Sequence, residues 1–180
     1  NGVAGKSPLT PSEVLELGRC AGRILRKETG RAHARVLAVR DTRASGETIL
    51  NQLAKGLREF GVDVYDAGVL ATPSVACLVQ AHHFDSGVVI SGSHDPPQFN
   101  GIKFFNSHGR KWPDHWEREV EELFFAERKA KPAKGGGSVI VADNLASDYE
   151  EFLIDSLGGK TSLSGLRLAL DCSNGANARV

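Results

Sequence analysis

A serine and a histidine, Ser93 and His94, stand side by side in a polar loop within "GVVISGSHDPPQFNGIKFF", residues 87–105. The apolar run before them is typical of a buried strand. Ligands of parallel α/β sheets collect beyond the carboxyl ends of the strands, because loops and helix N-termini expose backbone N–H groups there. Gly92 would let the backbone approach a ligand closely. Ser93 could therefore take part in chemistry, or it could simply cap a turn.

Serine hydrolase chemistry does not fit this loop. A nucleophile elbow places glycine two residues before and two residues after its serine. Here those positions hold Ser91 and Asp95. His94 is also a poor base for its neighbour, because adjacent side chains diverge and a triad histidine comes from elsewhere in the chain.

A phosphorylated serine fits the surrounding residue types better. Its phosphate would carry about −1.5 to −2 charges and would need nearby cations and N–H donors. The candidate cations are His94, Lys103, Arg40 and Arg43. Each could be an ordinary surface residue, and only their expected place on one rim of the sheet makes them a set.

Other clusters are weaker candidates for a site. His82 and His83 end a predicted helix, where histidine interacts favourably with the helix dipole without any metal. The glycines at 135–137 lack the lysine of a P-loop and the setting of a dinucleotide-binding turn. The three cysteines are far apart and outside any C-x-x-C spacing, which indicates reduced thiols and no zinc site.

The elements that must position the Ser93 loop alternate between helix and strand. Thr10, a proline and Glu13 form a helix start with a capping box. The expected order is a helix over 11–29, a strand over 36–39, a helix ending before Gly61, a strand over 62–68, a helix over 73–82 and a strand over 86–91. This alternation predicts an α/β fold with a mixed, largely parallel sheet flanked by helices.

Beyond the loop, "NGIKFF" predicts a further strand, and a helix is expected from Pro113 with Val120 inward. The charged, glycine-rich stretch "KAKPAKGGGS" is typical of a connector. The expected domains are an α/β domain over 1–130, a linker over 131–146, and the start of a second, similar α/β domain over 147–180. In that last part "LRLALDCSNGA" predicts a strand and its turn.

Composition limits the function classes. Lysine and arginine total 22, as do aspartate and glutamate, so no net charge attracts nucleic acid or an acidic membrane surface. The sequence has neither a signal-peptide core nor an apolar run of membrane-spanning length. Together with the reduced thiols, these features predict a cytoplasmic protein that binds neither nucleic acid nor membrane.

At this point the sequence resembles the α-D-phosphohexomutases, which include phosphoglucomutase/phosphomannomutase and phosphoglucosamine mutase. The likeness runs through "GVAGKSPLTPSEVLELGRCAGRIL", "VRDTRASG", "GLREFGVDVYDAGVLATPSVA", "SGSHDPPQFNGIKFF" and "LALDCSNGA". It implies a phosphotransferase of the isomerase class. Such an enzyme interconverts hexose 6-phosphate and hexose 1-phosphate of glucose, mannose or glucosamine, through a phosphoserine and a bisphosphorylated sugar.

The resemblance also implies roles for single residues. Ser93 would carry the phosphoryl group, and Mg²⁺ would bind through that phosphate, with its remaining ligands outside this chain. Lys103 would serve in proton transfer, and His94 would line the loop. The residues expected to support the loop are Arg43, Asp95, Asn100 and Gly101. The family's metal and sugar loops would lie outside this chain, so the chain alone is expected to be inactive.

Asp95 departs from the family, which usually has asparagine there. A carboxylate beside a phosphorylated serine would repel the phosphate unless it is protonated, paired or turned away. His94, Lys103 and Arg43 are the candidate partners. Asp95 leaves a second function open, that of a non-catalytic phosphosugar-binding or regulatory relative. The particular hexose and the oligomeric state stay open as well.

Overall fold

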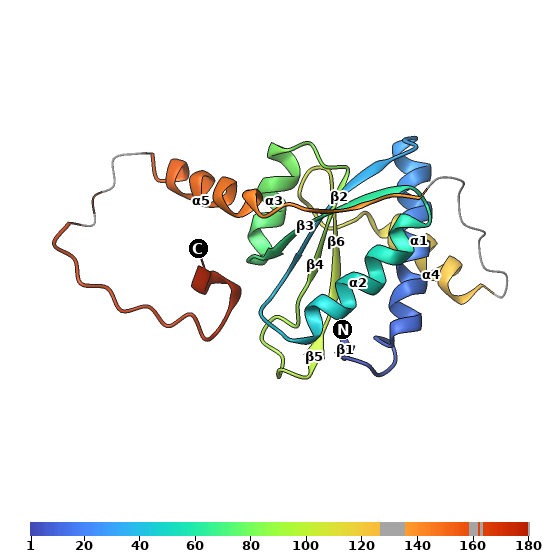
Figure 1. Cartoon of the computed structure of the whole chain (residues 1–180), viewed down its shortest axis with the longest axis horizontal. Helices are drawn as coiled ribbons and strands as arrows, with labels where there is room; N and C mark the ends of the chain where they lie inside the picture. The colour runs from blue at the N-terminus through green and yellow to red at the C-terminus, as the bar shows by residue number, and fades with distance from the viewer. Residues whose placement is uncertain (127–135, 159–161, 163, 180) are drawn as a thin grey trace.

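The computed structural model describes residues 1–126, 136–158, 162 and 164–179 (Figure 1). Its strands are β1 (Gly2–Val3), β2 (Ala34–Arg40), β3 (Val62–Val69), β4 (Ser86–Ile90), β5 (Phe99–Asn100), β6 (Ile102–Asn106) and β7 (Val139–Val141). Its α-helices are α1 (Pro11–Thr29), α2 (Ser45–Arg58), α3 (Thr72–Ala81), α4 (Asp114–Phe125) and α5 (Asn144–Ser156). A short 3-10 helix covers Ala176–Arg179.

Among the described residues, five strands form the central sheet in the order β6-β4-β2-β3-β7. β2 pairs in parallel with β3 and β4, and β7 pairs in parallel with β3. β6 runs antiparallel to β4, while β1 and β5 form a separate antiparallel pair. The predicted mixed, largely parallel sheet is therefore confirmed.

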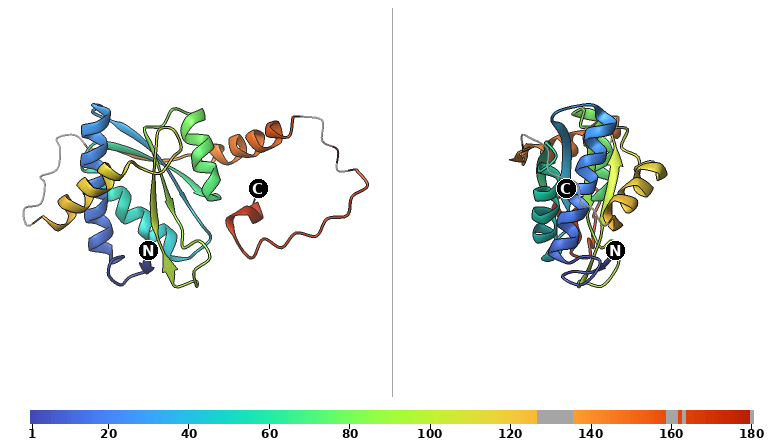
Figure 2. Two further views of the ribbon diagram at one scale, coloured as in Figure 1. Left: turned by 180° about the vertical axis from the view of Figure 1, so that it is seen from behind. Right: turned by 90° about the vertical axis from the view of Figure 1, so that its right-hand side faces the viewer.

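Helices cover both faces of this sheet. Side chains of α1, α2 and α4 form one buried cluster, and side chains of α3 and α5 form the other. Figure 1 shows how these helices lie around the sheet, and Figure 2 shows them from behind. Strand β2 supplies both clusters, with Val36 on the α1 side and Leu37 on the α3 side. A strand buried on both faces is apolar throughout, which explains the continuous run "VLAV".

Helix α1 begins and ends where the sequence predicts. The Thr10 hydroxyl accepts a hydrogen bond from the Glu13 amide at 3.3 Å, and the Glu13 carboxylate accepts one from the Thr10 amide at 3.2 Å. Hydrogen bonds from the side chains of Thr10 and then Ser7 lower the pKa of Glu13. The helix ends at Gly30, which has the left-handed conformation that closes many helices.

The end of the chain differs from the prediction. Within the expected linker over 131–146, β7 joins the edge of the sheet, and α5 begins at Asn144. Leu145 and Tyr149 are buried beside α3. The sequence did not predict β7, because a strand of three residues is too short to give a clear apolar pattern. Residues 127–135 lie outside the described residues, and the division into two domains stays a prediction.

The strand predicted in "LRLALDCSNGA" is not formed. Leu166, Leu168 and Leu170 are exposed and belong to no strand. A strand needs a hydrogen-bonded neighbour, and no described residue pairs with this segment.

None of the described helices has the length and apolar composition needed to cross a bilayer.

Helices α1 and α2 touch backbone to backbone. A Cβ atom on Gly18 would lie 2.3 Å from the carbonyl oxygen of Leu53, and one on Gly56 would lie 2.2 Å from that of Leu15. Real Cβ atoms do not approach backbone so closely. Glycine is therefore required at both positions, although it disfavours helix by about 1 kcal/mol relative to alanine.

Replacing Gly56 with alanine should lower the free energy of unfolding by about 1–3 kcal/mol, because the added methyl group overpacks the helix contact. Helix propensity alone predicts the opposite sign. Urea denaturation measures the change, and Lys55→Ala on the exposed face of the same helix is the control, with an expected effect within about 0.5 kcal/mol. A Gly56→Ala protein as stable as the wild type would contradict the close helix contact.

Candidate active site

Ser93 occupies an unusual backbone conformation at the carboxyl edge of the sheet. It follows β4 and has a φ of 54°, which non-glycine residues adopt uncommonly. Its amide donates to the Ser91 hydroxyl at 3.0 Å, and the Asp95 amide donates to the Gly92 carbonyl at 3.0 Å. The Ser93 side chain is exposed. Left-handed residues that the surroundings hold in place cluster at functional sites, so the loop is a candidate for one.

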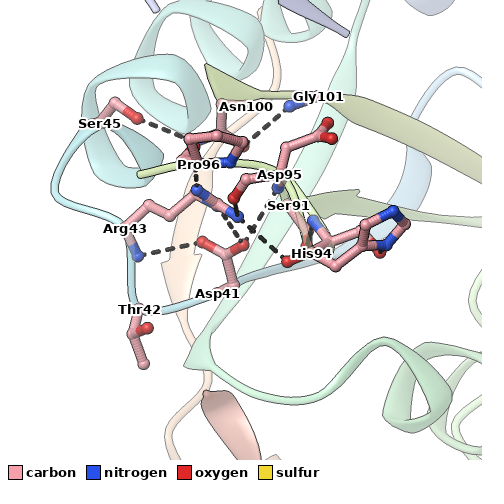
Figure 3. Close-up of polar contacts among 12 residues, drawn as sticks. Asp41, Thr42, Arg43, Ser45, Ser91, His94, Asp95, Pro96, Asn100 and Gly101 are labelled. Atoms are coloured by element: carbon pink, nitrogen blue, oxygen red, sulfur yellow. Dashed lines mark hydrogen bonds and ion pairs between the residues drawn. The ribbon is translucent and has the colours of Figure 1, made fainter. Parts of the chain in front are cut away.

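Arg43, in the loop after the neighbouring strand β2, holds the Ser93 loop in place. One terminal nitrogen of its guanidinium donates to the carbonyl oxygens of Ser93 and Asp95 at 3.0 and 2.7 Å. The other donates to the Pro96 carbonyl at 2.8 Å. Figure 3 shows the guanidinium against the inner side of the loop. The geometry agrees with the supporting position expected for Arg43.

Asp41 orients Arg43 and binds the loop at the same time. One of its carboxylate oxygens accepts from the Arg43 amide at 3.0 Å. The other accepts from Arg43 Nε at 3.0 Å and from the Gly92 amide at 3.1 Å (Figure 3). Sequence reasoning missed Asp41. Its signal was an acidic residue directly after β2, at the strand end where ligand sites form.

Gly92 is required by Arg43. A Cβ atom at residue 92 would lie 2.5 Å from Nε and Cζ of Arg43. The sequence suggested that this glycine lets a ligand approach the backbone. In the structure, the atoms closest to such a Cβ belong to the Arg43 guanidinium. The absence of a side chain at Gly92 therefore makes room for Arg43.

His94 lies beside the serine hydroxyl. Its Nδ1 atom is 3.3 Å from the Ser93 hydroxyl oxygen, within hydrogen-bond distance. The expectation that adjacent side chains diverge is therefore wrong here, because the left-handed backbone at Ser93 turns the two side chains together. The pair brings an imidazole to the group that would exchange protons and phosphate.

Two of the predicted cations, Lys103 and Arg40, make no contact with Ser93 among the described residues. Lys103 is exposed on β6, in register with Val89 of β4, and its ammonium has no partner within the described part of the chain. Arg40 faces Glu47 of α2, with 3.9 Å between the nearest charged atoms. Of the four predicted cations, His94 and Arg43 are the two that line the cavity beside Ser93 in the described part of the chain.

Asp95 lacks the partners expected for its carboxylate. Arg43 binds the carbonyl oxygen of Asp95 and leaves the carboxylate alone. Among the described residues, no ion pair reaches this carboxylate, and Figure 3 shows it pointing away from the Asp41–Arg43 pair. Pairing of this carboxylate with His94, Lys103 or Arg43 is therefore not observed among the described residues.

Asn100 and Gly101 tie the far end of the loop to the domain. The fully buried Asn100 side chain donates to the Ser45 hydroxyl at 2.9 Å and accepts from the Gly101 amide at 2.9 Å (Figure 3). The Gly101 carbonyl accepts from the Ser91 amide at 3.0 Å. These contacts fix the return of the loop next to the start of α2.

A cavity of 1320 Å³ opens beside Ser93. Its walls come from the Asp41–Ser45 loop, the start of α3, the Ser93 loop and the turn at 171–177. The volume is ample for a phosphorylated sugar, since small-molecule sites span about 300–1,000 Å³. Across the described residues, no group of three or more histidine, cysteine, aspartate or glutamate side chains could hold a metal ion.

Replacing Arg43 with lysine should loosen the Ser93 loop, because a single ammonium cannot reproduce the planar set of donors. Exchange of the amide hydrogens at 92–95 and 98 should accelerate by at least about tenfold, since charge-assisted hydrogen bonds are removed. Arg110→Lys, at an exposed arginine, is the control and should leave the loop unchanged. Unaltered exchange in Arg43→Lys would show that the guanidinium does not hold the loop.

Comparison with known proteins agrees with this geometry. A family model described as "Phosphoglucomutase/phosphomannomutase, alpha/beta/alpha domain I" matches residues 1–131. Phosphoglucosamine mutases are similar to this chain: that of Syntrophotalea carbinolica is 41% identical over 99% of this chain and 40% of its own length. That of Streptococcus uberis is 42% identical over 98% of this chain and 39% of its own length. The chain thus spans about 40% of the length of these relatives.

Solved structures of phosphoglucomutase/phosphomannomutase proteins are also similar to this chain. A phosphoglucomutase/phosphomannomutase family protein from Burkholderia thailandensis superimposes with a TM-score of 0.70 at 30% identity, over 91% of this chain and 34% of that one. The phosphoglucomutase parafusin from Paramecium superimposes with a TM-score of 0.74 at 15% identity, over 96% of this chain and 37% of that one, and shows the fold alone. From the match over residues 1–131, this chain belongs to the phosphoglucomutase/phosphomannomutase family and carries its domain I.

Proposed function

We propose that this chain is the phosphoserine domain of a phosphosugar mutase, in which Ser93 carries the phosphoryl group between hexose 6-phosphate and hexose 1-phosphate. The observation that carries the proposal is the loop geometry. Arg43 binds the carbonyl oxygens of the loop, while the Ser93 hydroxyl stays exposed beside a cavity of 1320 Å³. The relatives named phosphoglucosamine mutase favour a glucosamine phosphate as substrate.

In the proposed reaction, the bond between phosphorus and the Ser93 oxygen breaks as a bond to a sugar hydroxyl oxygen forms. The proton of that hydroxyl leaves, and the second half of the reaction returns the other phosphate of the bisphosphorylated sugar to Ser93. His94 would give a proton to the Ser93 oxygen as the phosphate leaves and take it back when the serine attacks the second phosphate, because its Nδ1 atom is 3.3 Å from the hydroxyl oxygen. We assign proton transfer at the sugar hydroxyl to Lys103, whose exposed side chain would contact the bound sugar.

Arg43 supports this chemistry indirectly. Carbonyl oxygens carry partial negative charge, and those of Ser93, Asp95 and Pro96 all face the guanidinium. They therefore do not face a phosphate on the serine hydroxyl. Phosphoryl transfer depends on positioning and electrostatics, so a loop fixed in this way is suited to it.

Magnesium belongs to the proposal only through the phosphate on Ser93. The described residues contain no cluster of side chains that could hold the ion on their own. This chain would thus contribute a single phosphate oxygen, and the ion would supply neutralisation of charge at the transferring oxygens. We also propose a cytoplasmic location, with hexose phosphate as the partner and neither nucleic acid nor membrane.

The intact protein should carry phosphate on Ser93. Mass spectrometry of peptides from the active full-length enzyme should place the group there, and Ser93→Ala should reduce turnover by at least about a thousandfold, because the acceptor oxygen is removed. Unfolding free energy should change by less than about 1 kcal/mol, since an exposed hydroxyl packs little. Ser107→Ala, at another exposed serine, should behave as the wild type. Active enzyme with unmodified Ser93 would refute the proposal.

Asp95 decides between a working mutase and a regulatory relative. A bare unit charge about 4 Å from the phosphate would cost about 4 kcal/mol at a surface-like dielectric, or about a thousandfold in phosphorylation. Because the carboxylate is partly exposed and solvent screens its charge, Asp95→Asn in the full-length protein should change phosphate occupancy and turnover by less than about tenfold. A gain near a thousandfold would favour the regulatory relative, and a severe loss would contradict both functions.

A further inference from the structure

The cavity beside Ser93 has one wall that comes from far along the sequence. Residues 171–177, called the distal turn below, line the same cavity as Ser93 and His94. Figures 1 and 2 show residues 164–179 leading back toward the sheet. The leucines that lead into the turn are exposed. The turn itself is therefore the part of this segment that returns to the domain.

The distal turn has its own internal order. The Ser173 amide donates to the Asp171 carboxylate at 2.8 Å, and the Gly175 amide donates to the Cys172 carbonyl at 2.7 Å. Ser173 and Asn174 both have positive φ, at 47° and 55°. A turn closed by such local bonds moves as a unit, so a single anchor can set its position.

That anchor is Thr42. Its hydroxyl donates to the carbonyl oxygen of Asn174 at 2.7 Å. Among the described residues, this hydrogen bond is the one that connects the distal turn to the sheet domain. Thr42 stands between Asp41 and Arg43, which hold the Ser93 loop, and its side chain points away from that pair (Figure 3). One short segment after β2 thus holds two walls of the cavity.

We infer that Thr42 is a positioning residue that holds the distal turn as a wall of the phosphosugar site, at a fixed place relative to the Ser93 loop. The identity of the ligand rests on the proposed function, whereas the anchoring contact does not. In this arrangement, Asp41 and Arg43 place the reacting serine, and Thr42 places the surface that faces the sugar phosphate across the cavity.

Cys172 in the distal turn provides a direct probe of this anchor. Its thiol is partly exposed and lines the cavity. In the full-length protein without ligand, Thr42→Val should accelerate alkylation of Cys172 by iodoacetamide about fivefold, the effect of one ordinary hydrogen bond on a local opening equilibrium. Thr42→Ser keeps the donor and should restore the wild-type rate. Mass spectrometry of the peptide that contains Cys172 gives the rate.

Thr29 offers a matched control. Its hydroxyl donates to the Leu25 carbonyl at 2.7 Å, a bond of the same kind at the end of α1. Thr29→Val should leave the reactivity of Cys172 unchanged. Equal rates in Thr42→Val and the wild type would overturn the anchor, and so would an equal acceleration in Thr29→Val, because the effect would then be general loosening.

Ligand protection tests the wall. Saturating glucosamine 6-phosphate should slow alkylation of Cys172 by at least about fivefold in the wild type. It should leave Cys77 unaffected, because Cys77 lies in α3 and does not line the cavity. Inorganic phosphate should protect less, since it does not span the cavity. An enzyme that turns over the sugar without protecting Cys172 would overturn the assignment of the turn as a wall.

Kinetics separate positioning from a general structural defect. Thr42→Val should raise KM for the hexose phosphate by about fivefold with kcat within about twofold, because weakening the binding of substrate and transition state equally leaves kcat unchanged. A fall in kcat without a rise in KM would contradict the inference. If the full-length protein has no mutase activity, the proposed function fails, while the alkylation rates without ligand still decide whether Thr42 anchors the turn.

Discussion

The ion pair between Asp41 and Arg43 is the constraint on which the site depends. Its two side chains come from a single loop after β2, yet together they bind the amide of Gly92 and the carbonyls of Ser93, Asp95 and Pro96. Both groups are largely buried, with exposed side-chain fractions of 12% for Arg43 and 18% for Asp41. A largely buried arginine with four of its five side-chain N–H donors engaged fixes geometry far better than a solvated one, so Ser93 has a defined place without being buried itself.

The fold brings two strand ends together at this ion pair. β2 and β4 are parallel neighbours, so the loops that follow them meet at one edge of the sheet. The Asp41 amide donates to the Ile90 carbonyl at 2.9 Å and continues the strand pairing into the site. The close contact of α1 and α2 and the burial of β2 and β4 on both faces keep this edge in register. Function therefore depends on packing that lies well away from the serine.

The sequence alone predicted the fold to the extent that its patterns were local. The capping box at Thr10 and the strand over 36–39 depend on neighbouring residues, and both are found as expected. The pairing of β7 with β3 and the hydrogen bond between Thr42 and Asn174 join residues far apart in the chain. No short sequence pattern can therefore predict them. At the site, Arg43 was expected to support the loop, whereas Asp41 became visible only when its distances to both Arg43 and Gly92 were known.

The central claim is that Ser93 is a phosphoryl carrier held by Arg43, and isotope transfer tests it most directly. The full-length enzyme would be incubated with a hexose 1,6-bisphosphate labelled with ³²P, digested, and its labelled peptide sequenced. We expect label on Ser93, removed rapidly by unlabelled hexose 6-phosphate in the wild type and slowly in Arg43→Lys. Label on another residue, or label on Ser93 that unlabelled sugar phosphate does not remove, would contradict the claim.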